Sequence, residues 1–526
     1  MDVVQNDTQQ VTVLPPARYS QTRAKMLSCD IENRAGAGHR NRAMLLVCLA
    51  AVLLALLRPL VAAGSSVPTM QLDVLVYNIE YEGSPDTDAV MRLIEADIVG
   101  VLESYDRLPE IARETGYPYY NTSLQLLSKF PIHEPSGALG LYALIEVQPG
   151  FVVAFFNVHL DYVETAPGKR LLTEGESALP NLLEVENRVR ASALERQFEA
   201  MKRLLDDGYP VFLTGDFNQP SSLDYPRPGV PFNVPWPVSE KLFELGFRDS
   251  FREIFPDPDA WPAATIGDAK SGNRIDYIYV GGPSTTIDSD LVGPESNPYV
   301  TIPYDPWTSD HRAIVSSFDV APVAMPTMVS VDARIGNAGD QRIIRYKAPT
   351  ADRNSIAIVK EGGDPASPLE TLGAIDESGS VSFDTSDMDA TAYEAVLIIA
   401  GAERARVKFQ LRDPNARIRL TTDKPTYKSG ESIAVSWTDG PGSRWDWLVV
   451  YRADASNPTV DDYLGWVYTD GHSAGTLPPG VSGSRTYPGE SAQEATWPLP
   501  PGDYVLHYMP MDQYNVAGSV SIAVVP

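Results

Sequence analysis

Among the first 311 of the 526 residues of this chain, residues able to do acid–base or metal chemistry stand at the ends of apolar runs. In the clearest case, an apolar run that starts at Val211 passes through Gly215 to Asp216 and Asn218. One such stretch is weak evidence, because many strands end in Asp or Asn for turn geometry alone. The pattern recurs, however, at or beside other strand-like runs, at Asn78, Glu103, His159, Asp276, Asp310 and His311.

These residue types indicate one kind of chemistry. Carboxylate and amide oxygens are ligands suited to Mg²⁺, Mn²⁺ or Ca²⁺, and no cysteine-rich spacing indicates structural zinc. Histidines beside carboxylates can transfer protons near neutral pH. A metal for charge, a histidine for the proton and a water nucleophile together suit hydrolysis of a phosphate ester.

The segment 70–320 must position these side chains, and its alternating strands and helices predict an α/β domain. A run of hydrophobic residues with a polar residue at its end predicts each strand, and amphipathic spacing predicts each helix. The strands are expected at Asp73–Tyr77, Asp97–Leu102, Leu126–Ile132 (broken by Pro131), Phe151–Phe156, Val211–Thr214, Arg274–Val280 and Ala313–Phe318, and the helices at Thr87–Ala96 and Leu182–Asp206.

The ordered set of motifs resembles the endonuclease/exonuclease/phosphatase superfamily. The motifs are Asn78, Glu103, Ser128–Ile132, Asn157-Val-His159, Gly215–Asn218, Arg274–Tyr277 and Ser309–His311. The resemblance implies a four-layered α/β sandwich over about residues 70–320, with the site at one rim. Residues 216–256 are similar to secreted microbial members.

The resemblance also implies a role for each site residue. Asn78, Glu103 and Asp310 are expected to bind a metal, Mg²⁺ or else Mn²⁺ or Ca²⁺. Asp216 and Asn218 would position the attacking water and the phosphate, and Asp276 and His311 would form a carboxylate–histidine pair. His159 would donate to a phosphoryl oxygen, and both Asp216 and His311 remain candidates for the general base.

Single residues from this set also have ordinary explanations. Asn78 and Asn218 are common turn or capping residues, and an isolated Glu103 would most often be a solvated charge. An isolated His159 on a buried strand would most often be a hydrogen-bonded core residue. Asp276, between Ile275 and Tyr277, favours function without the rest, because an unpaired buried charge is costly.

The N-terminal region predicts export. Residues 1–42 are polar and are expected to form a disordered leader. Residues 43–64 combine a basic flank, a short apolar run and a small-residue exit, which indicates a signal peptide or an N-terminal membrane anchor. Both cysteines, Cys29 and Cys48, lie before a plausible cleavage site after Ala63, so a cleaved protein would hold no disulfide. We expect a secreted or extracytoplasmic protein.

The last 200 residues read as β structure after a linker at 321–326. Short strand-like runs separated by Gly, Pro, Asp and Ser predict two β-sandwich modules, at 327–412 and 415–526. The second resembles immunoglobulin-like accessory modules, which implies a possible cell-surface or glycan contact. Its four central tryptophans could form a sugar platform or, more commonly, a core: Trp437, Trp445, Trp447 and Trp466.

Charge bears on the substrate. The chain has a net charge of −27, of which residues 65–320 carry −21, and no basic stripe of the kind that follows a nucleic-acid backbone is seen. A nucleic acid, a lipid headgroup in the manner of sphingomyelinases and a small phosphoester all remain open as substrates. A non-catalytic surface-binding protein on a hydrolase scaffold is the alternative from another class, and the intact set of polar residues argues against it.

Overall fold

The computed structural model describes residues 69–162, 167–349, 353–374, 377–455, 463–470, 480–488 and 496–526. The leader predicted at 1–42 and the signal or anchor predicted at 43–64 lie outside these ranges. No helix among the described residues has the length and apolar character needed to span a bilayer. Residues Val67–Pro526 pack as one compact unit.

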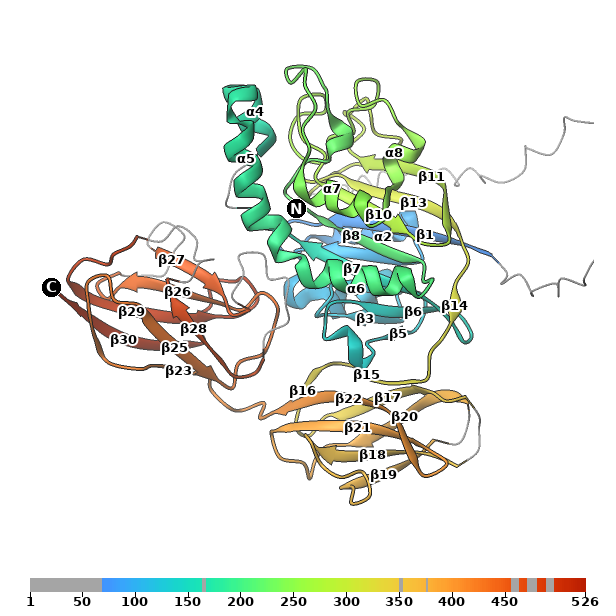
Figure 1. Ribbon diagram of the computed structural model, residues 1–526, viewed down its shortest axis with the longest axis vertical. Helices are drawn as coiled ribbons and strands as arrows, with labels where there is room; N and C mark the ends of the chain where they lie inside the picture. The colour runs from blue at the N-terminus through green and yellow to red at the C-terminus, as the bar shows by residue number, and fades with distance from the viewer. Residues whose placement is uncertain are drawn as a thin grey trace, which may run out of the picture. The chain divides into compact units, whose positions relative to one another are not determined.

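Two seven-stranded sheets face each other in the first part of this unit (Figure 1). The first sheet has the order β12-β11-β13-β1-β2-β4-β3, and the second has the order β5-β6-β7-β8-β10-β9 with β14 beside β7. The first contains β1 Met70–Asn78, β2 Ile98–Leu102, β3 Tyr119–Asn121, β4 Leu126–Ser128, β11 Ser284–Gly293, β12 Ile302–Pro303 and β13 Ala313–Val320. The second contains β5 Ile132–His133, β6 Ala143–Gln148, β7 Phe151–His159, β8 Val211–Asp216, β9 Arg248–Asp249, β10 Asp276–Gly281 and β14 Val323–Ala324.

Helices cover the outer face of each sheet, and other helices pack elsewhere in this part of the chain. The helices are α2 Pro85–Ile94, α3 Leu108–Thr115, α4 Pro167–Glu174, α5 Leu179–Glu186, α6 Glu195–Asp206, α7 Pro237–Glu244 and α8 Ser250–Ile254. Apolar residues of α2 and α3 pack on β1 and β2, whereas those of α6 and α7 pack on β7 and β8. Between the sheets, side chains such as Val74, Phe155 and Phe212 form a shared core. The four-layered α/β fold expected from the sequence is therefore confirmed.

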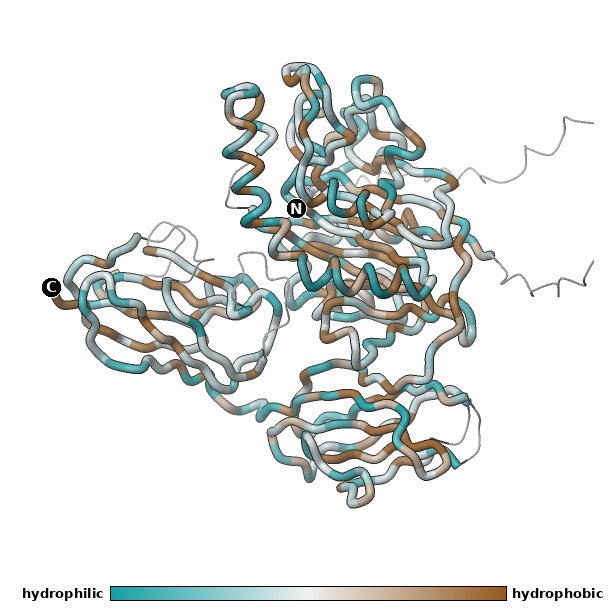
Figure 2. Tube along the Cα trace, viewed as in Figure 1, coloured by the Kyte–Doolittle hydropathy of each residue, from teal (hydrophilic) through white to brown (hydrophobic). Residues whose placement is uncertain are grey.

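The hydropathy of the chain explains this layering. The central strands carry nearly continuous apolar residues (Figure 2), and β2 and β8 are buried at every position. Strands with both faces buried show this pattern because each face meets another layer. The helices are amphipathic, and in α6 Phe198, Met201 and Leu204 form the buried stripe.

Three of the predicted elements need correction. Leu126–Ile132, predicted as a strand broken by Pro131, forms two strands, β4 and β5, that lie in different sheets. At the break, the Ser128 hydroxyl accepts from the Phe130 amide, and Pro131 has no amide hydrogen to continue the pairing. The predicted helix Leu182–Asp206 is broken into α5, a π-helical turn at Asn187–Ala191, and α6. The predicted linker 321–326 contains β14, which pairs with β7.

The π-helical turn has a local cause. It holds the fully buried Arg190 against the equally buried Glu186, with the Arg190 Nε donating to the Asp161 carbonyl at 2.9 Å. A buried charge needs such partners, and a widened helical turn is one way to reach them. A regular hydrophobic period does not reveal this need.

After β14 the described chain forms two pairs of sheets. The first pair has the orders β15-β17-β20 and β16-β22-β21-β18-β19, and the second has β23-β25-β28 and β24-β30-β29-β26-β27. The first pair contains β15 Met328–Val331, β16 Ile335–Asn337, β17 Gln341–Lys347, β18 Asn354–Lys360, β19 Glu370–Ala374, β20 Ser378–Asp384, β21 Ala392–Ile399 and β22 Ala402–Arg412. The second contains β23 Arg419–Thr422, β24 Thr426–Lys428, β25 Ile433–Thr438, β26 Trp447–Arg452, β27 Tyr463–Tyr468, β28 Gly483–Tyr487, β29 Gly502–Met509 and β30 Gly518–Val525. We call β23–β30 and their loops the C-terminal sandwich.

Each pair of sheets encloses its own apolar cluster, as β-sandwiches do. Trp437 lies in the core of the C-terminal sandwich, and Trp445, Trp447 and Trp466 belong to a second buried cluster. All four are at most 7% exposed. They therefore do not present an open sugar platform, and the core alternative describes them.

Candidate active site

Three strands of the second sheet bring the predicted residues to one edge. In the parallel pair β7 and β8, His159 lies opposite Asp216, and in the antiparallel pair β8 and β10, Asp276 lies opposite Asp216. Residues opposite each other on neighbouring strands project from the same face of a sheet. His159 and Asp276, which are 117 positions apart in the sequence, therefore both lie beside the Asp216 carboxylate.

The Asp216 carboxylate is the centre of the site. Its Oδ2 lies 3.6 Å from His159 Nε2 and 3.6 Å from His311 Nε2, and it accepts from Asn78 Nδ2 at 3.1 Å. Its Oδ1 accepts from the Asn218 amide at 2.9 Å. Because Asn78 ends β1 in the first sheet, this cluster joins the rims of both sheets.

His311 and Asp276 form a buried pair. His311 Nδ1 lies 2.8 Å from Asp276 Oδ2, and Asp276 Oδ1 has no hydrogen-bond partner among the residues that the structure describes. Burial lowers the pKa of His311, but the Asp276 and Asp216 carboxylates outweigh this, so the net pKa lies well above its usual range. The imidazolium form is therefore favoured, and its Nε2–H can donate toward the site.

Glu103, Asp310 and Asn78 lie beside this pair. Glu103 accepts from Asn78 Nδ2 at 2.9 Å and from the Tyr81 amide at 3.1 Å, and the Asp310 amide donates to Glu80 Oε2 at 3.0 Å. Burial raises the pKa of Asp310, and the Glu103 and Asp216 carboxylates raise it further. Within the described ranges no lysine or arginine pairs with Glu103, Asp310 or Asp216. This excess of negative charge, on oxygen donors, fits a divalent cation.

A second group could also hold a metal: the ligand atoms of Asp216, Asp276 and His311 lie within 4.8 Å of one another. It differs from the predicted set of Asn78, Glu103 and Asp310. The pairing of His311 Nδ1 with Asp276 and the favoured imidazolium form both oppose a cation there. The Glu103 side therefore stays the predicted position of a metal.

The comparisons with known proteins concern the α/β part of the chain. Residues 75–311 match the model of the Endonuclease/Exonuclease/phosphatase family. The α/β domain belongs to this family. The uncharacterized protein F14F9.5 of Caenorhabditis elegans is 24% identical over 266 residues, which are 43% of this chain and 82% of that protein.

Two solved structures are similar to part of this chain. An endonuclease/exonuclease/phosphatase family protein from Bacteroides thetaiotaomicron is 18% identical with a TM-score of 0.32, and the match covers 48% of this chain and 96% of that one. Humanized TDP2 of D. rerio is 14% identical with a TM-score of 0.30, and the match covers 48% and 99%.

Asn157 belongs to one of the motifs found in the sequence, but no role of its own was predicted for it. Asn157 is buried, and its Nδ2 donates to the carbonyls of Val101, Leu124 and Gln125 while its Oδ1 accepts from the Thr214 hydroxyl at 2.8 Å. This amide ties β7 to the end of β2, just before Glu103. A lone amide inside an apolar strand is a signal that could have revealed the role.

Ser309 and Asn218 fix two turns of the α/β domain. The Ser309 hydroxyl donates to the Asn78 carbonyl at 2.7 Å and accepts from the His311 amide at 3.1 Å. Asn218, with φ of +47°, donates through Nδ2 to the Leu160 carbonyl at 3.0 Å. Ser309 thus connects the strand bearing Asn78 with the turn bearing His311, and the side chain of Asn218 braces the chain after β7.

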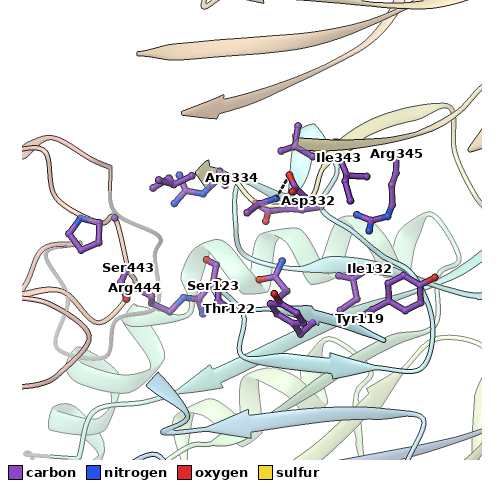
Figure 3. A pocket seen from close by; sticks show the side chains of 18 of the residues that line it. Tyr119, Thr122, Ser123, Ile132, Asp332, Arg334, Ile343, Arg345, Ser443 and Arg444 are labelled. Carbon is purple, nitrogen blue, oxygen red and sulfur yellow. Dashed lines mark hydrogen bonds between the residues drawn. The ribbon is translucent and has the colours of Figure 1, made fainter. Parts of the chain in front are cut away.

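A pocket of about 460 Å³ lies apart from these residues (Figure 3). Its walls include Tyr119 of the α/β domain, Arg334 and Arg345 of the pair of sheets formed by β15–β22, and Arg444 of the C-terminal sandwich. None of the eight predicted site residues lines it. The hollow therefore marks a junction of modules and is separate from the rim that holds the predicted site residues.

Proposed function

We propose that this chain is a metal-dependent hydrolase of phosphate esters that uses an activated water. The observation that carries the proposal is the convergence of His159, His311 and Asn78 on the Asp216 carboxylate. Membership of the family supports a phosphoesterase, and the geometry supports a working site, because these polar groups sit at one rim with compatible partners.

The roles follow from the contacts. Asp276 holds the ring of His311 and stabilises its charged form, so that Nε2–H can donate to the phosphoryl group or leaving oxygen. Asp216 is placed to orient a water and accept its proton, and His159 is placed to donate to a phosphoryl oxygen. Glu103, Asp310 and Asn78 would hold Mg²⁺ or Mn²⁺, which supplies positive charge against the phosphate oxygens when bound.

Charge favours a compact substrate. Residues 65–320 carry −21, and Glu80, Glu82, Glu103 and Asp310 lie at or beside the rim. Duplex DNA binding depends on lysine and arginine contacts to phosphates. A small phosphodiester or a lipid headgroup meets less of this repulsive field, so we propose that class of substrate, with nucleic acid as the alternative. Export of the protein remains a proposal that rests on residues 43–64.

A substrate panel on the full chain tests the function. The substrates are bis(p-nitrophenyl) phosphate, p-nitrophenyl phosphorylcholine, duplex DNA and RNA, each assayed after EDTA treatment and after restoring Mg²⁺ or Mn²⁺. Hydrolysis should vanish in EDTA and return with metal, and full activity in EDTA would overturn the metal assignment. Added monovalent salt should help the DNA reaction, whereas a steep loss with salt would reveal a basic track and favour a nuclease.

Two histidine variants provide the matched control. His311→Ala should abolish most hydrolysis, because it removes the partner of Asp276. His507→Ala should not, since His507 lies on β29 with its Nδ1 2.8 Å from the Ser519 hydroxyl, away from the rim. Similar losses in both variants, with folding verified by circular dichroism, would contradict the site.

A further inference from the structure

A loop beside the proposed metal site has an unfavourable backbone. Glu80, Tyr81 and Glu82 follow one another with φ of +54°, +40° and +71°, a region that residues with side chains rarely adopt. Such backbone persists only where surrounding contacts hold it, and it clusters at functional sites. Here the loop holds the site directly, because the Tyr81 amide donates to Glu103 and Glu80 accepts from the Asp310 amide.

The C-terminal sandwich holds this loop from outside the family domain. Gln513 Nε2 donates to Glu82 Oε1, a hydrogen bond between residues 431 positions apart. Beside it, the Tyr105 hydroxyl donates to Asp512 Oδ2 at 3.4 Å. Tyr105, with φ of +44°, stands two residues after Glu103, which itself has φ of +60°. Gln513 and Asp512 therefore contact the two segments beside Glu103, the loop that holds Glu82 and the turn that holds Tyr105.

The holding segment, Met511–Gln513, is itself built rigidly. Met511 and Asp512 both have φ of +57°. The buried Asp446 carboxylate accepts from the Met511 amide at 3.2 Å, and the Asp512 amide donates to the Trp445 carbonyl at 2.7 Å. The Tyr468 hydroxyl donates to Asp512 Oδ1 at 2.9 Å. A segment fixed by that many partners can impose a conformation on what it touches.

A second contact reaches the histidine side of the site. The Trp445 indole packs against the His159 imidazole with ring centroids 5.8 Å apart and an interplanar angle of 60°. Its neighbour Arg444 donates to the Gly140 carbonyl at 2.7 Å and to the Asn157 carbonyl at 3.4 Å, two residues before His159 on β7. His159 is thus bounded on one side by the C-terminal sandwich.

We propose that the C-terminal sandwich is part of the catalytic apparatus. Gln513 positions the Glu80–Gly83 loop and with it Glu103 and Asp310, whereas Trp445 positions the imidazole of His159. Both are positioning residues that act through groups of the family domain. The inference rests on the proposed phosphoester hydrolysis, and it excludes a sandwich that serves only as a tether or a carbohydrate-binding appendage.

The test uses the full chain with the variants Gln513→Ala and Trp445→Ala. The control is Trp497→Ala, which removes another tryptophan of the same sandwich, one that packs against Tyr487 and the core of that sandwich. Outer partners of metal-site groups typically affect affinity or activity about 10–100-fold. Gln513→Ala should weaken Mn²⁺ binding, followed by electron paramagnetic resonance, by about 10-fold and lower kcat by a similar factor, whereas Trp497→Ala should leave both unchanged.

Two further measurements isolate the contacts. If Gln513 acts through Glu82, the double variant Gln513→Ala/Glu82→Ala should lose no more Mn²⁺ affinity than Gln513→Ala alone. The chain has six histidines, so the imidazole signals can be assigned by nuclear magnetic resonance. Trp445→Ala should shift the His159 signal by removing the neighbouring ring, whereas Trp497→Ala should not.

The outcomes separate this inference from the proposed function. Mn²⁺ affinity and the His159 signal report on positioning even if none of the tested phosphoesters is cleaved. The inference would be overturned if Gln513→Ala had the same Mn²⁺ affinity as Trp497→Ala and Trp445→Ala had the same His159 signal as Trp497→Ala. This holds whatever the hydrolysis assay shows. Changes in both, with an inactive chain, would uphold the positioning and refute the proposed reaction.

Discussion

Replacing Asp276 by Asn isolates the charge of the carboxylate–histidine pair. The substitution keeps the size of the side chain and removes only the negative charge, which lies 2.8 Å from His311 Nδ1. Two unit charges about 4 Å apart interact by ~4 kcal/mol at an effective dielectric constant of about 20. One pKa unit corresponds to about 1.4 kcal/mol, so the imidazolium of His311 loses stabilisation worth about three units.

We therefore expect Asp276→Asn to lower kcat by about 10²–10³-fold, in line with the usual contribution of a positioned acid or base. KM should change little, because Asp276 is fully buried and does not reach the substrate. Folding should survive: Asp276 Oδ1 has no hydrogen bond to lose within the described residues, and an unpaired amide there costs about 1–3 kcal/mol.

The assay is steady-state hydrolysis of a chromogenic phosphodiester at saturating Mg²⁺, with thermal unfolding measured in parallel. Asp319→Asn is the matched control, because Asp319 is an exposed carboxylate on β13. Because Asp276 and His311 act as one unit, Asp276→Asn/His311→Ala should be little worse than His311→Ala alone. A kcat within threefold of the wild type in a folded Asp276→Asn protein would refute the assigned role of the pair.

Three further predictions concern the metal, the core and a buried ion network. Glu103→Ala should lower kcat at least ~100-fold, the usual scale for losing a charge-stabilising group, and should weaken Mn²⁺ binding measured by electron paramagnetic resonance; unchanged Mn²⁺ affinity would move the metal elsewhere. Gly100→Ala should destabilise by about 1–3 kcal/mol in urea unfolding, because a Cβ there would lie 2.2 Å from the Thr214 hydroxyl, and Thr214→Ala should relieve part of the loss. Asp224→Asn should cost about 3–5 kcal/mol at pH 7, because it leaves the buried Arg252 and Arg274 without their shared partner. Burial raises the pKa of Asp224, but both guanidinium groups outweigh burial, so the net pKa is lowered. The stability that the Asp224 carboxylate contributes is therefore present above the ordinary pKa of 3.8 and is lost as the pH falls below it. An equal cost of Asp224→Asn at pH 3 and pH 7 would contradict the ion network.

The positions of Asp216, Asp276 and His159 could be predicted because each follows or begins an apolar strand. A strand's end is visible in sequence as a change from apolar to polar residues, and the ends of neighbouring strands meet at one edge of a sheet. Register is not visible in the same way, so the sequence could not tell that Asp216 lies opposite both His159 and Asp276. The break in Leu126–Ile132 could be predicted because Pro131 has no amide hydrogen, but the placement of β4 and β5 in different sheets depends on tertiary packing.

The contribution of the C-terminal sandwich could not be predicted from any local pattern. Gln513 and Glu82 lie in ordinary polar segments, and their hydrogen bond depends on how the α/β domain and the C-terminal sandwich pack. Trp445 carries the ordinary signal of a core residue, and its indole does belong to a buried cluster while its edge meets His159. One side chain thus satisfies a packing rule and a positioning role together, and only the packed structure separates the two.

Backbone strain and charge at this rim point to one physical requirement. Glu80–Glu82, Glu103, Met511 and Asp512 all adopt left-handed backbone within one contact region, and each such residue costs about 1–3 kcal/mol. The same region gathers carboxylates that repel one another, so neither its backbone nor its charge is favourable by itself. Contacts from the C-terminal sandwich compensate the backbone, and a divalent cation bound by Glu103 and Asp310 would compensate the charge. Removing either compensation should therefore loosen the same loop, which is why Gln513→Ala and metal removal are expected to impair the site in the same way.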